Sequence, residues 1–410
     1  MNAKLLIKRF LLIICVLVII LTSLSGCYDA RGIEDLAYVT ALGIDITDND
    51  MLLLTFQISI PESSSNSGSG SSQSSKSQTT SVQCTSINSG ISLANSYISK
   101  QINLSHCKVI VFSEEIASKG VNSYIDTLSN NIEIRPDCNV IVSRGTAKDF
   151  IENAQPSIES LTARYYEIAL KSSEYTGYTT FTEFAIFVND VKNSFIDATA
   201  ILGGVNSGEN IIEEKPYAGI DVNYVAAETP IDDENSMETF GTAVFQGDKF
   251  VGELTGFETL CFLIMSNQIE NCTISVPSSF GQIDLAIRES KNPKIKVELD
   301  NYVPNITVDV YLEAHGLTLN SNIDYTSFEN IEELENSASK FIQSKFTDFL
   351  YKTSKEYNSD IVGFGRYALS KYLTWDEWIA SNWAEHYKDS NFNVNVNLNV
   401  ISGSEFDKSP

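Results

Sequence analysis

Three kinds of hydrophobic pattern follow one another along the chain. Residues 10–21 (FLLIICVLVIIL) are apolar without a break, residues 63–81 (SSSNSGSGSSQSSKSQTTS) contain no large apolar side chain, and many other segments alternate with the period of a strand or a helix. A segment without such side chains cannot bury enough surface to offset the entropy of ordering it. We therefore expect residues 63–81 to be a flexible loop. It is expected inside one domain, because too few residues precede it to fold alone.

The apolar run near the start has the features of a secretory signal. Three basic residues within positions 4–9 precede it, and its twelve residues would span roughly 18 Å, whereas the hydrocarbon core of a bilayer is about 30 Å thick. Residues 1–26 are therefore predicted to be a signal peptide. The sequence Leu-Ser-Gly-Cys at 24–27 has the form of a bacterial lipobox, so Cys27 is expected to carry a covalent diacylglycerol and to become the mature N-terminus. The alternative is an uncleaved anchor over residues 5–24.

The pattern between residues 28 and 150 predicts strands alternating with helices. Two apolar segments, 37–46 and 51–60, flank the turn-rich sequence DITDND, which predicts a hairpin. The elements expected after the serine-rich segment are a helix at 90–100, a strand at 107–112, helices at 113–119 and 121–128, a strand at 138–142 and a helix at 147–153. This order predicts a mixed sheet with helices packed on it.

The second part of the chain also shows the periods of helices and strands. Helices are expected at 161–171 and 253–266, strands at 198–205 and 219–226, and a hairpin at 241–252. Apolar residues alternate with polar ones at 306–313 and 392–400, which predicts half-buried strands. A capping box, Thr326-x-x-Glu329, is expected to open a long helix. The three tryptophans, Trp375, Trp378 and Trp383, are expected in one helix after Leu373.

These elements define an α/β (α+β) protein of 410 residues with mixed sheets packed against helices. The length favours about three domains. We expect an N-terminal domain at 28–150, a middle domain at 151–235 and a C-terminal domain at 236–405.

The net charge limits the kinds of partner. Removing the three cations of the leader lowers the formal net charge from −25 to −28. Such a surface repels phosphate backbones and anionic lipid headgroups, which argues against a nucleic-acid partner and against membrane binding through charge. Membrane attachment then depends on the lipid at Cys27, where two acyl chains give a stable anchor and one gives only a marginal one.

No motif of catalytic, cofactor or metal chemistry occurs in the sequence, so no enzyme is predicted. The three histidines, His106, His315 and His386, are isolated, and the acidic turn at 45–50 lacks the glycine and the final glutamate of an EF-hand loop. The tryptophans are interpreted as core rather than as a sugar or peptide site. Five cysteines remain outside the leader and the lipobox, an odd number without C-x-x-C spacing, so their disulfide state stays open: Cys84, Cys107, Cys138, Cys261 and Cys272. Cys107 is interpreted as a buried small hydrophobe.

Five segments, taken in order, resemble the Ger(x)C family, the C-subunit lipoproteins of bacterial spore germinant receptors. The first, from Cys27-Tyr28-Asp29-x-Arg31 to Gly43-Ile44-Asp45, resembles the family's opening C-[WY]-D-x-R-E-[LI]…G-[IL]-G-[IV]-D. The others are the serine-rich loop, HCKVIVFSEE at 106–115, GTAVF at 241–245 with Lys249 and Val251-Gly252, and DIVGFG at 360–365 followed by Trp375 and Trp383. Gly32-Ile33-Glu34-Asp35 departs from the charged pair that many members carry before leucine.

The resemblance implies a lipoprotein on the outer face of the cell membrane or spore inner membrane, working with a polytopic A subunit and an integral-membrane B subunit. It implies no catalysis and no cofactor. Two other classes remain open: a solute-binding lipoprotein of a transporter, which should show two similar lobes, and a lipid-anchored wall hydrolase, which needs a carboxylate pair or metal in a groove.

Overall fold

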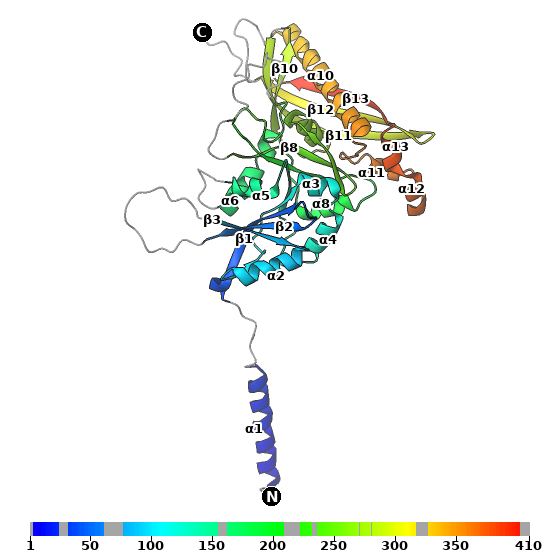
Figure 1. Ribbon diagram of the computed structural model, residues 1–410. Coiled ribbons are helices and arrows are strands. Elements are labelled where there is room, and N and C mark those ends of the chain that lie inside the picture. Colours follow the sequence, from blue (N-terminus) through cyan, green and yellow to red (C-terminus); the bar gives the residue numbers. More distant parts are fainter. Residues whose placement is uncertain are drawn as a thin grey trace.

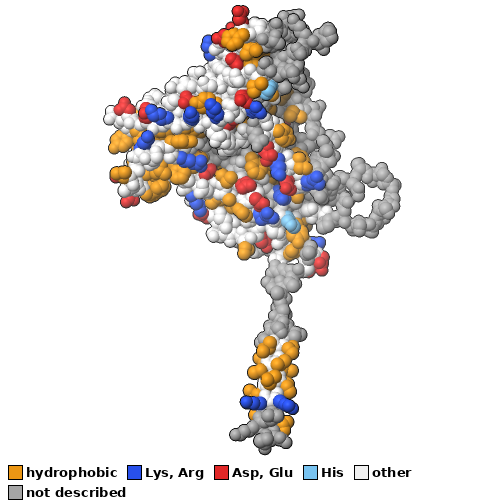
Figure 2. All heavy atoms as spheres, turned by 180° about the vertical axis from the view of Figure 1, so that it is seen from behind, with side chains coloured by type: hydrophobic (Ala, Val, Ile, Leu, Met, Phe, Trp, Pro, Cys, Tyr) orange, Lys and Arg blue, Asp and Glu red, His pale blue; other side chains and the backbone are white. Residues whose placement is uncertain are grey.

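The computed structural model describes residues 3–23, 32–60, 77–154, 162–208, 222–231, 236–269, 271–279, 281–316 and 327–401. Helix α1 (Ala3–Ser23) stands apart from the folded body (Figure 1), and its side chains from Leu6 to Ile20 are exposed. Figure 2 shows this helix as a nearly continuous apolar surface with basic side chains near its outer end. Within the described residues, no helix combines the length and apolarity needed to cross a membrane. The lipobox and Cys27 lie outside the described residues.

A mixed nine-stranded sheet forms the larger part of the body (Figure 1). Its order is β3-β2-β1-β5-β6-β7-β8-β9, with β4 paired to β1, and the central strands β1, β5, β6 and β7 run parallel. The strands are β1 (Leu36–Ile46), β2 (Leu52–Ser59), β3 (Ser77–Cys84), β4 (Gln101–Asn103), β5 (Val109–Ser113), β6 (Asn139–Ser143), β7 (Thr199–Val205), β8 (Met237–Gln246) and β9 (Lys249–Leu254). The predicted hairpins at 37–60 and 241–252 and the mixed sheet are confirmed.

Helices cover both faces of this sheet. Buried side chains of α2 (Ile87–Tyr97), α3 (Glu114–Lys119), α4 (Asn122–Ser129) and α8 (Phe184–Val191) share one hydrophobic core with the strands. Those of α5 (Ala147–Glu152) and α6 (Thr162–Leu170) form a second core with the alternate strand residues. A short helix, α7 (Ser173–Thr176), follows. Strands with both faces buried explain the continuous apolar runs in β5 and β6.

Two expectations for this part are wrong. Residues 77–81 belong to β3 rather than to a flexible loop, because their backbone pairs with β2 and the Ser81 hydroxyl bonds the Thr55 hydroxyl at 3.0 Å. Serine and threonine side chains do not prevent a ladder whose bonds come from the backbone. The rest of the expected loop, 63–76, lies outside the described residues. Residues 222–226 form no strand, and 219–221 also lie outside the described residues.

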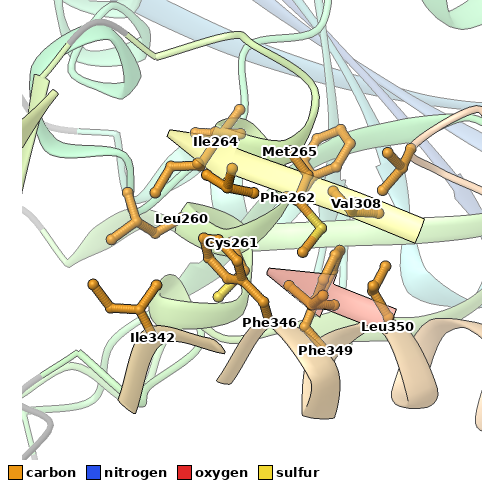
Figure 3. Packing of buried hydrophobic residues seen from close by; sticks show 14 of the residues in the cluster. Leu260, Cys261, Phe262, Ile264, Met265, Val308, Ile342, Phe346, Phe349 and Leu350 are labelled. Atoms are coloured by element: carbon orange, nitrogen blue, oxygen red, sulfur yellow. The ribbon is translucent and has the colours of Figure 1, made fainter. Parts of the chain in front are cut away.

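A second sheet has four strands in the order β10-β11-β12-β13. The strands β10 (Asn271–Ser278), β11 (Gly281–Asp300) and β12 (Val303–Gly316) form an antiparallel meander, and β13 (Asn391–Val400) runs parallel to β12. The predicted alternation in β12 is confirmed, since Ile306, Val308, Val310 and Leu312 are all buried. Helices α9 (Gly256–Met265) and α10 (Phe328–Tyr351) pack against this buried face, and Figure 3 shows side chains of α9 meeting Ile342, Phe346 and Phe349 of α10.

The helices after β12 differ from expectation at two places. Helix α10 has Ser327 as its N-cap, without a side-chain capping bond, and Thr326 lies outside the described residues. A π-helical turn (Lys352–Glu356) ends α10, and α11 (Gly365–Leu369) follows. The tryptophans lie in two helices, α12 (Trp375–Ser381) and α13 (Trp383–Tyr387), because Asn382 adopts a left-handed conformation (φ 46°) that an α-helix cannot continue through.

The large sheet takes strands from all three of the expected domains, 28–150, 151–235 and 236–405. The division of the chain into three domains stays a prediction. The chain passes from β9 directly into α9, so the β8–β9 hairpin lies where the two sheets join.

Candidate functional site at the junction of the two sheets

A buried carboxylate organises the loop of the DIVGFG segment. One Asp360 oxygen accepts the backbone N–H groups of Gly363 and Phe364, both at 2.9 Å. The other accepts the Gly365 N–H at 2.7 Å and the indole N–H of Trp383 at 2.9 Å. Because carboxylates accept several hydrogen bonds at once, this single side chain closes the loop and ties α13 to it.

Asp197, which precedes β7, connects this loop to the large sheet. One of its oxygens accepts the Gly247 N–H in the β8–β9 turn and the other accepts the Asp360 N–H, both at 2.9 Å. Its own N–H donates to the Asp360 carbonyl at 3.0 Å. The two aspartates thus join segments that are as much as 163 residues apart in the sequence.

Burial dominates the electrostatics of this pair. It raises the pKa of Asp360 to about 7, against the effect of the N–H donors that bond its oxygens, and the nearby Asp197 charge adds to the rise. Burial also raises the pKa of Asp197, while its bonds from Gly247 and Asp360 act in the opposite direction. A carboxyl that titrates near neutral pH is frequent at functional sites, but structural networks shift pKa values in the same way.

The β8–β9 hairpin and the end of α10 also interlock sterically. A Cβ added at Gly252 would lie 2.3 Å from the Tyr357 ring, whose hydroxyl donates to the Glu253 carbonyl at 2.8 Å. Lys352 bonds the same carbonyl at 3.1 Å and the Glu258 carboxylate at 2.7 Å. Gly252 therefore permits the close approach of the Tyr357 ring to the β8–β9 hairpin.

A cleft of about 650 Å³ opens beside the Asp360 loop. It lies between α8, the turn after α9, a bulged part of β11 and residues 361–367, and its charged lining residues are Asp190 and Arg366. Burial raises the pKa of Asp190, while a bond from Asn189 and the charge of Arg366 lower it. The rest of its lining combines apolar side chains with the amides of Asn189, Asn267 and Gln268, a mixture that suits binding of a small polar molecule.

The Gly43-Ile44-Asp45 segment has a local structural role. The Asp45 carboxylate accepts the backbone N–H groups of Ala147 at 2.7 Å and Lys148 at 3.0 Å, which caps the start of α5. A Cβ at Gly43 would lie 2.8 Å from the Ile151 side chain. The segment thus fixes α5 on the sheet.

The structure places the three histidines on different elements. His106 is exposed, with its ring 4.4 Å from that of Tyr38, His315 lies in β12, and His386 stacks on Tyr302 at 5.6 Å. Across the described ranges, no group of three or more His, Cys, Asp or Glu residues could hold a metal ion.

The cysteines outside the leader and lipobox are all free and buried: Cys84, Cys107, Cys138, Cys261 and Cys272. The interpretation of Cys107 as a buried hydrophobe is confirmed, and burial raises the pKa of its thiol to about 12. Burial raises the pKa of the other four thiols as well, which disfavours the thiolate, the reactive form of cysteine.

The core interpretation of the tryptophans is confirmed for Trp378 and Trp383 and wrong for Trp375. Trp378 is buried and its indole donates to the Ser194 hydroxyl at 2.9 Å, whereas Trp375 keeps 55% of its surface exposed. Asp197, Asp190 and Arg366 could not be predicted as junction or cleft residues from the sequence, because none of them lies in a recognisable motif.

Comparison with solved structures identifies the fold first. The fold is similar to that in "Crystal Structure of the GerBC protein", with a TM-score of 0.52, 17% identity, and 88% of this chain and 97% of that chain covered. Two family models then match, "Spore germination protein N-terminal domain" over residues 29–203 and "Spore germination B3/ GerAC like, C-terminal" over residues 240–403. The chain belongs to this Ger(x)C family of spore germination proteins.

Relatives are similar along nearly their whole length. "Putative spore germination protein YfkR" of Bacillus subtilis is 22% identical over 93% of this chain and 92% of its own. "Spore germination protein KC" of the same organism is 22% identical over the same shares. "Spore germination protein GerQC" of Bacillus cereus is 21% identical over 96% of this chain and 98% of its own.

Proposed function

We propose that the chain is the lipid-anchored C subunit of a nutrient germinant receptor and a non-catalytic partner of the polytopic A and B subunits. The observation that carries this is the match of both family models, over residues 29–203 and 240–403. Asp360 of the DIVGFG segment, with Asp197 and Trp383, forms the junction between the two sheets. The junction is a set of structural bonds rather than a reaction centre. It would hold the large sheet and the second sheet in a fixed relation.

The anchor in this proposal is a diacylglycerol on Cys27, at the outer face of the cell membrane or spore inner membrane. The repulsive net charge and the lipobox support it. Mass analysis of the mature chain should show an N-terminal Cys27 that carries lipid, and Cys27→Ala should leave the chain unprocessed or released. A cleaved, unmodified N-terminus that stays membrane-bound would falsify the lipid assignment.

Co-purification tests the partnership. The full chain, tagged at its C-terminus and expressed in its own spores, should recover the A and B subunits from membranes dissolved in mild detergent. Recovery of the chain without either membrane subunit, under conditions where both are present in the extract, contradicts the proposal.

One observation favours the second candidate, a solute-binding lipoprotein. The cleft beside the Asp360 loop has the volume and the opposite charges, Asp190 and Arg366, to hold a small polar solute. Against it, the described body has one nine-stranded and one four-stranded sheet rather than two similar lobes. A shift of melting temperature with a nutrient, abolished by Arg366→Ala, would favour this candidate.

A further inference from the structure

Three large apolar side chains are exposed together around α12. Leu373, two residues before the helix, is 94% exposed, and Trp375 and Ile379 are 55% and 51% exposed. Trp375 and Ile379 are four residues apart, so they lie on one face of the helix. We call these three residues the α12 patch.

The α12 patch is held on a rigid base. The hydroxyl of Thr374 accepts the Glu377 N–H, and the Glu377 carboxylate accepts the N–H groups of Leu373 and Thr374, which forms a capping box. On the neighbouring face of the helix, Trp378 is buried, bonds Ser194, and has the Tyr372 ring against its edge at 5.6 Å. The apolar side chains are therefore exposed on an ordered helix.

Such an arrangement is typical of a protein-binding surface. Exposed apolar groups gathered in one place on a soluble body mark interaction sites more often than scattered ones do. Tryptophan is enriched among the residues that dominate binding energy, and a rigid helix loses little entropy on binding. Trp375 is therefore the expected centre of the contact.

Charge decides which kind of partner fits. Asp376 and Glu377 are exposed on α12 itself, and the exposed Lys371 lies five residues before Asp376 in the sequence. Anionic lipid headgroups are repelled by these carboxylates and by the net charge of −25. In Figure 1, α12 also lies away from the end of the body where β1 begins. A protein groove with an apolar floor and a basic rim matches both features.

We propose that the α12 patch docks into an apolar, basic-rimmed groove on a membrane subunit of the receptor. This inference rests on the proposed function, because it assigns a surface to the contact that the proposal requires. The patch would insert Trp375 into the groove while Asp376, which flanks it on the helix, faces the basic rim.

The test uses the co-purification described above with the full chain in spores. Trp375→Ser combined with Ile379→Ser should lower recovery of the membrane subunits about tenfold or more, as expected for loss of a central contact. The matched control is Ile132→Ser, which removes an isoleucine that is 99% exposed elsewhere on the body. Leu373→Ser, which lies outside the helix, provides a second variant should the double variant fold poorly. Unchanged melting temperatures show that each variant folds.

The outcomes separate this inference from the proposed function. Recovery by the wild-type chain and by Ile132→Ser, with loss in the patch variants, supports the docking surface. Equal recovery by the patch variants overturns the inference and leaves the proposed function intact. Failure of the wild-type chain to recover either subunit overturns both. The patch variants can also be tested for binding to vesicles of phosphatidylglycerol and phosphatidylethanolamine. If they lose vesicle binding while subunit recovery is unchanged, the patch binds lipid and the inference of a docking surface is overturned.

Discussion

The stability of the chain should depend on pH through Glu289, because its carboxylate points to the core side of the second sheet. It pairs with the buried Leu312 across β11 and β12, and neither of its oxygens has a hydrogen-bond partner among the described residues. Burial raises the pKa of Glu289 from its usual 4.5 to about 7. Glutamine at this position removes the charge while keeping the shape.

The sign and size of the effect follow from linkage. Between pH 4.5 and 7 the folded chain holds a proton on Glu289 that the unfolded chain has lost, so stability falls as the pH rises through this window. The shift corresponds to at most about 3.4 kcal/mol. Because part of the side chain remains exposed, solvent screening reduces this, and we expect about 1 to 2 kcal/mol between pH 5 and pH 8.

The assay compares urea unfolding of the chain from residue 28 onward at pH 5 and pH 8. At pH 8, Glu289→Gln should be more stable than the wild type by most of the expected difference of about 1 to 2 kcal/mol. It should also lose less stability than the wild type between pH 5 and pH 8. The matched control is Glu298→Gln on the same strand, where Lys296 lowers the pKa of an exposed glutamate, so the loss between pH 5 and 8 should persist. If Glu289→Gln keeps the full loss, Glu289 is ionised in the folded chain at pH 5 and the reasoning is wrong.

Three further predictions concern the junction and the serine-rich segment. Trp383→Phe removes one donor to the Asp360 carboxylate and should lower the free energy of unfolding by about 2 kcal/mol. Trp375→Phe, at the exposed site, should change the free energy of unfolding by less than about 0.5 kcal/mol. Urea unfolding measures both variants. Gly252→Ala should cost about 2 kcal/mol because its Cβ would overlap the Tyr357 ring, and Tyr357→Leu in the same chain should recover part of the loss. Replacing residues 63–76 by a few Gly and Ser residues should leave the melting temperature nearly unchanged, because halving a loop alters its closure free energy by only about 0.6 kcal/mol. A replacement that extends through residue 81 should lower the melting temperature, because it removes part of β3.

Local patterns predicted the larger sheet well, because its strands and helices carry their own periodicity. No local pattern predicts the strand β11. Its stretch RESKNPKIK at 288–296 is charged and contains Pro293, which resembles a loop, yet pairing with β12 across two bulges holds it in the sheet. Residues 77–81 were misassigned for a similar reason, since a polar edge strand gains its bonds from the neighbouring backbone rather than from its own side chains.

The junction could be predicted only in part. The DIVGFG segment was recognised, but the role of Asp360 depends on Gly363 to Gly365 nearby and on Trp383 and Asp197 from distant segments. Nothing in the sequence around Asp197 indicates that its carboxylate bonds the β8–β9 turn. Such long-range bonds arise from the packing of the two sheets, which no local pattern encodes.

Germination of spores that lack the chain tests the central claim most directly. The deletion strain, with no paralogue expressed, should stay dormant towards the nutrients of its own receptor, respond normally to triggers that bypass receptors, and recover when the wild-type chain is restored. Nutrient germination at the wild-type rate in the deletion strain would contradict the account.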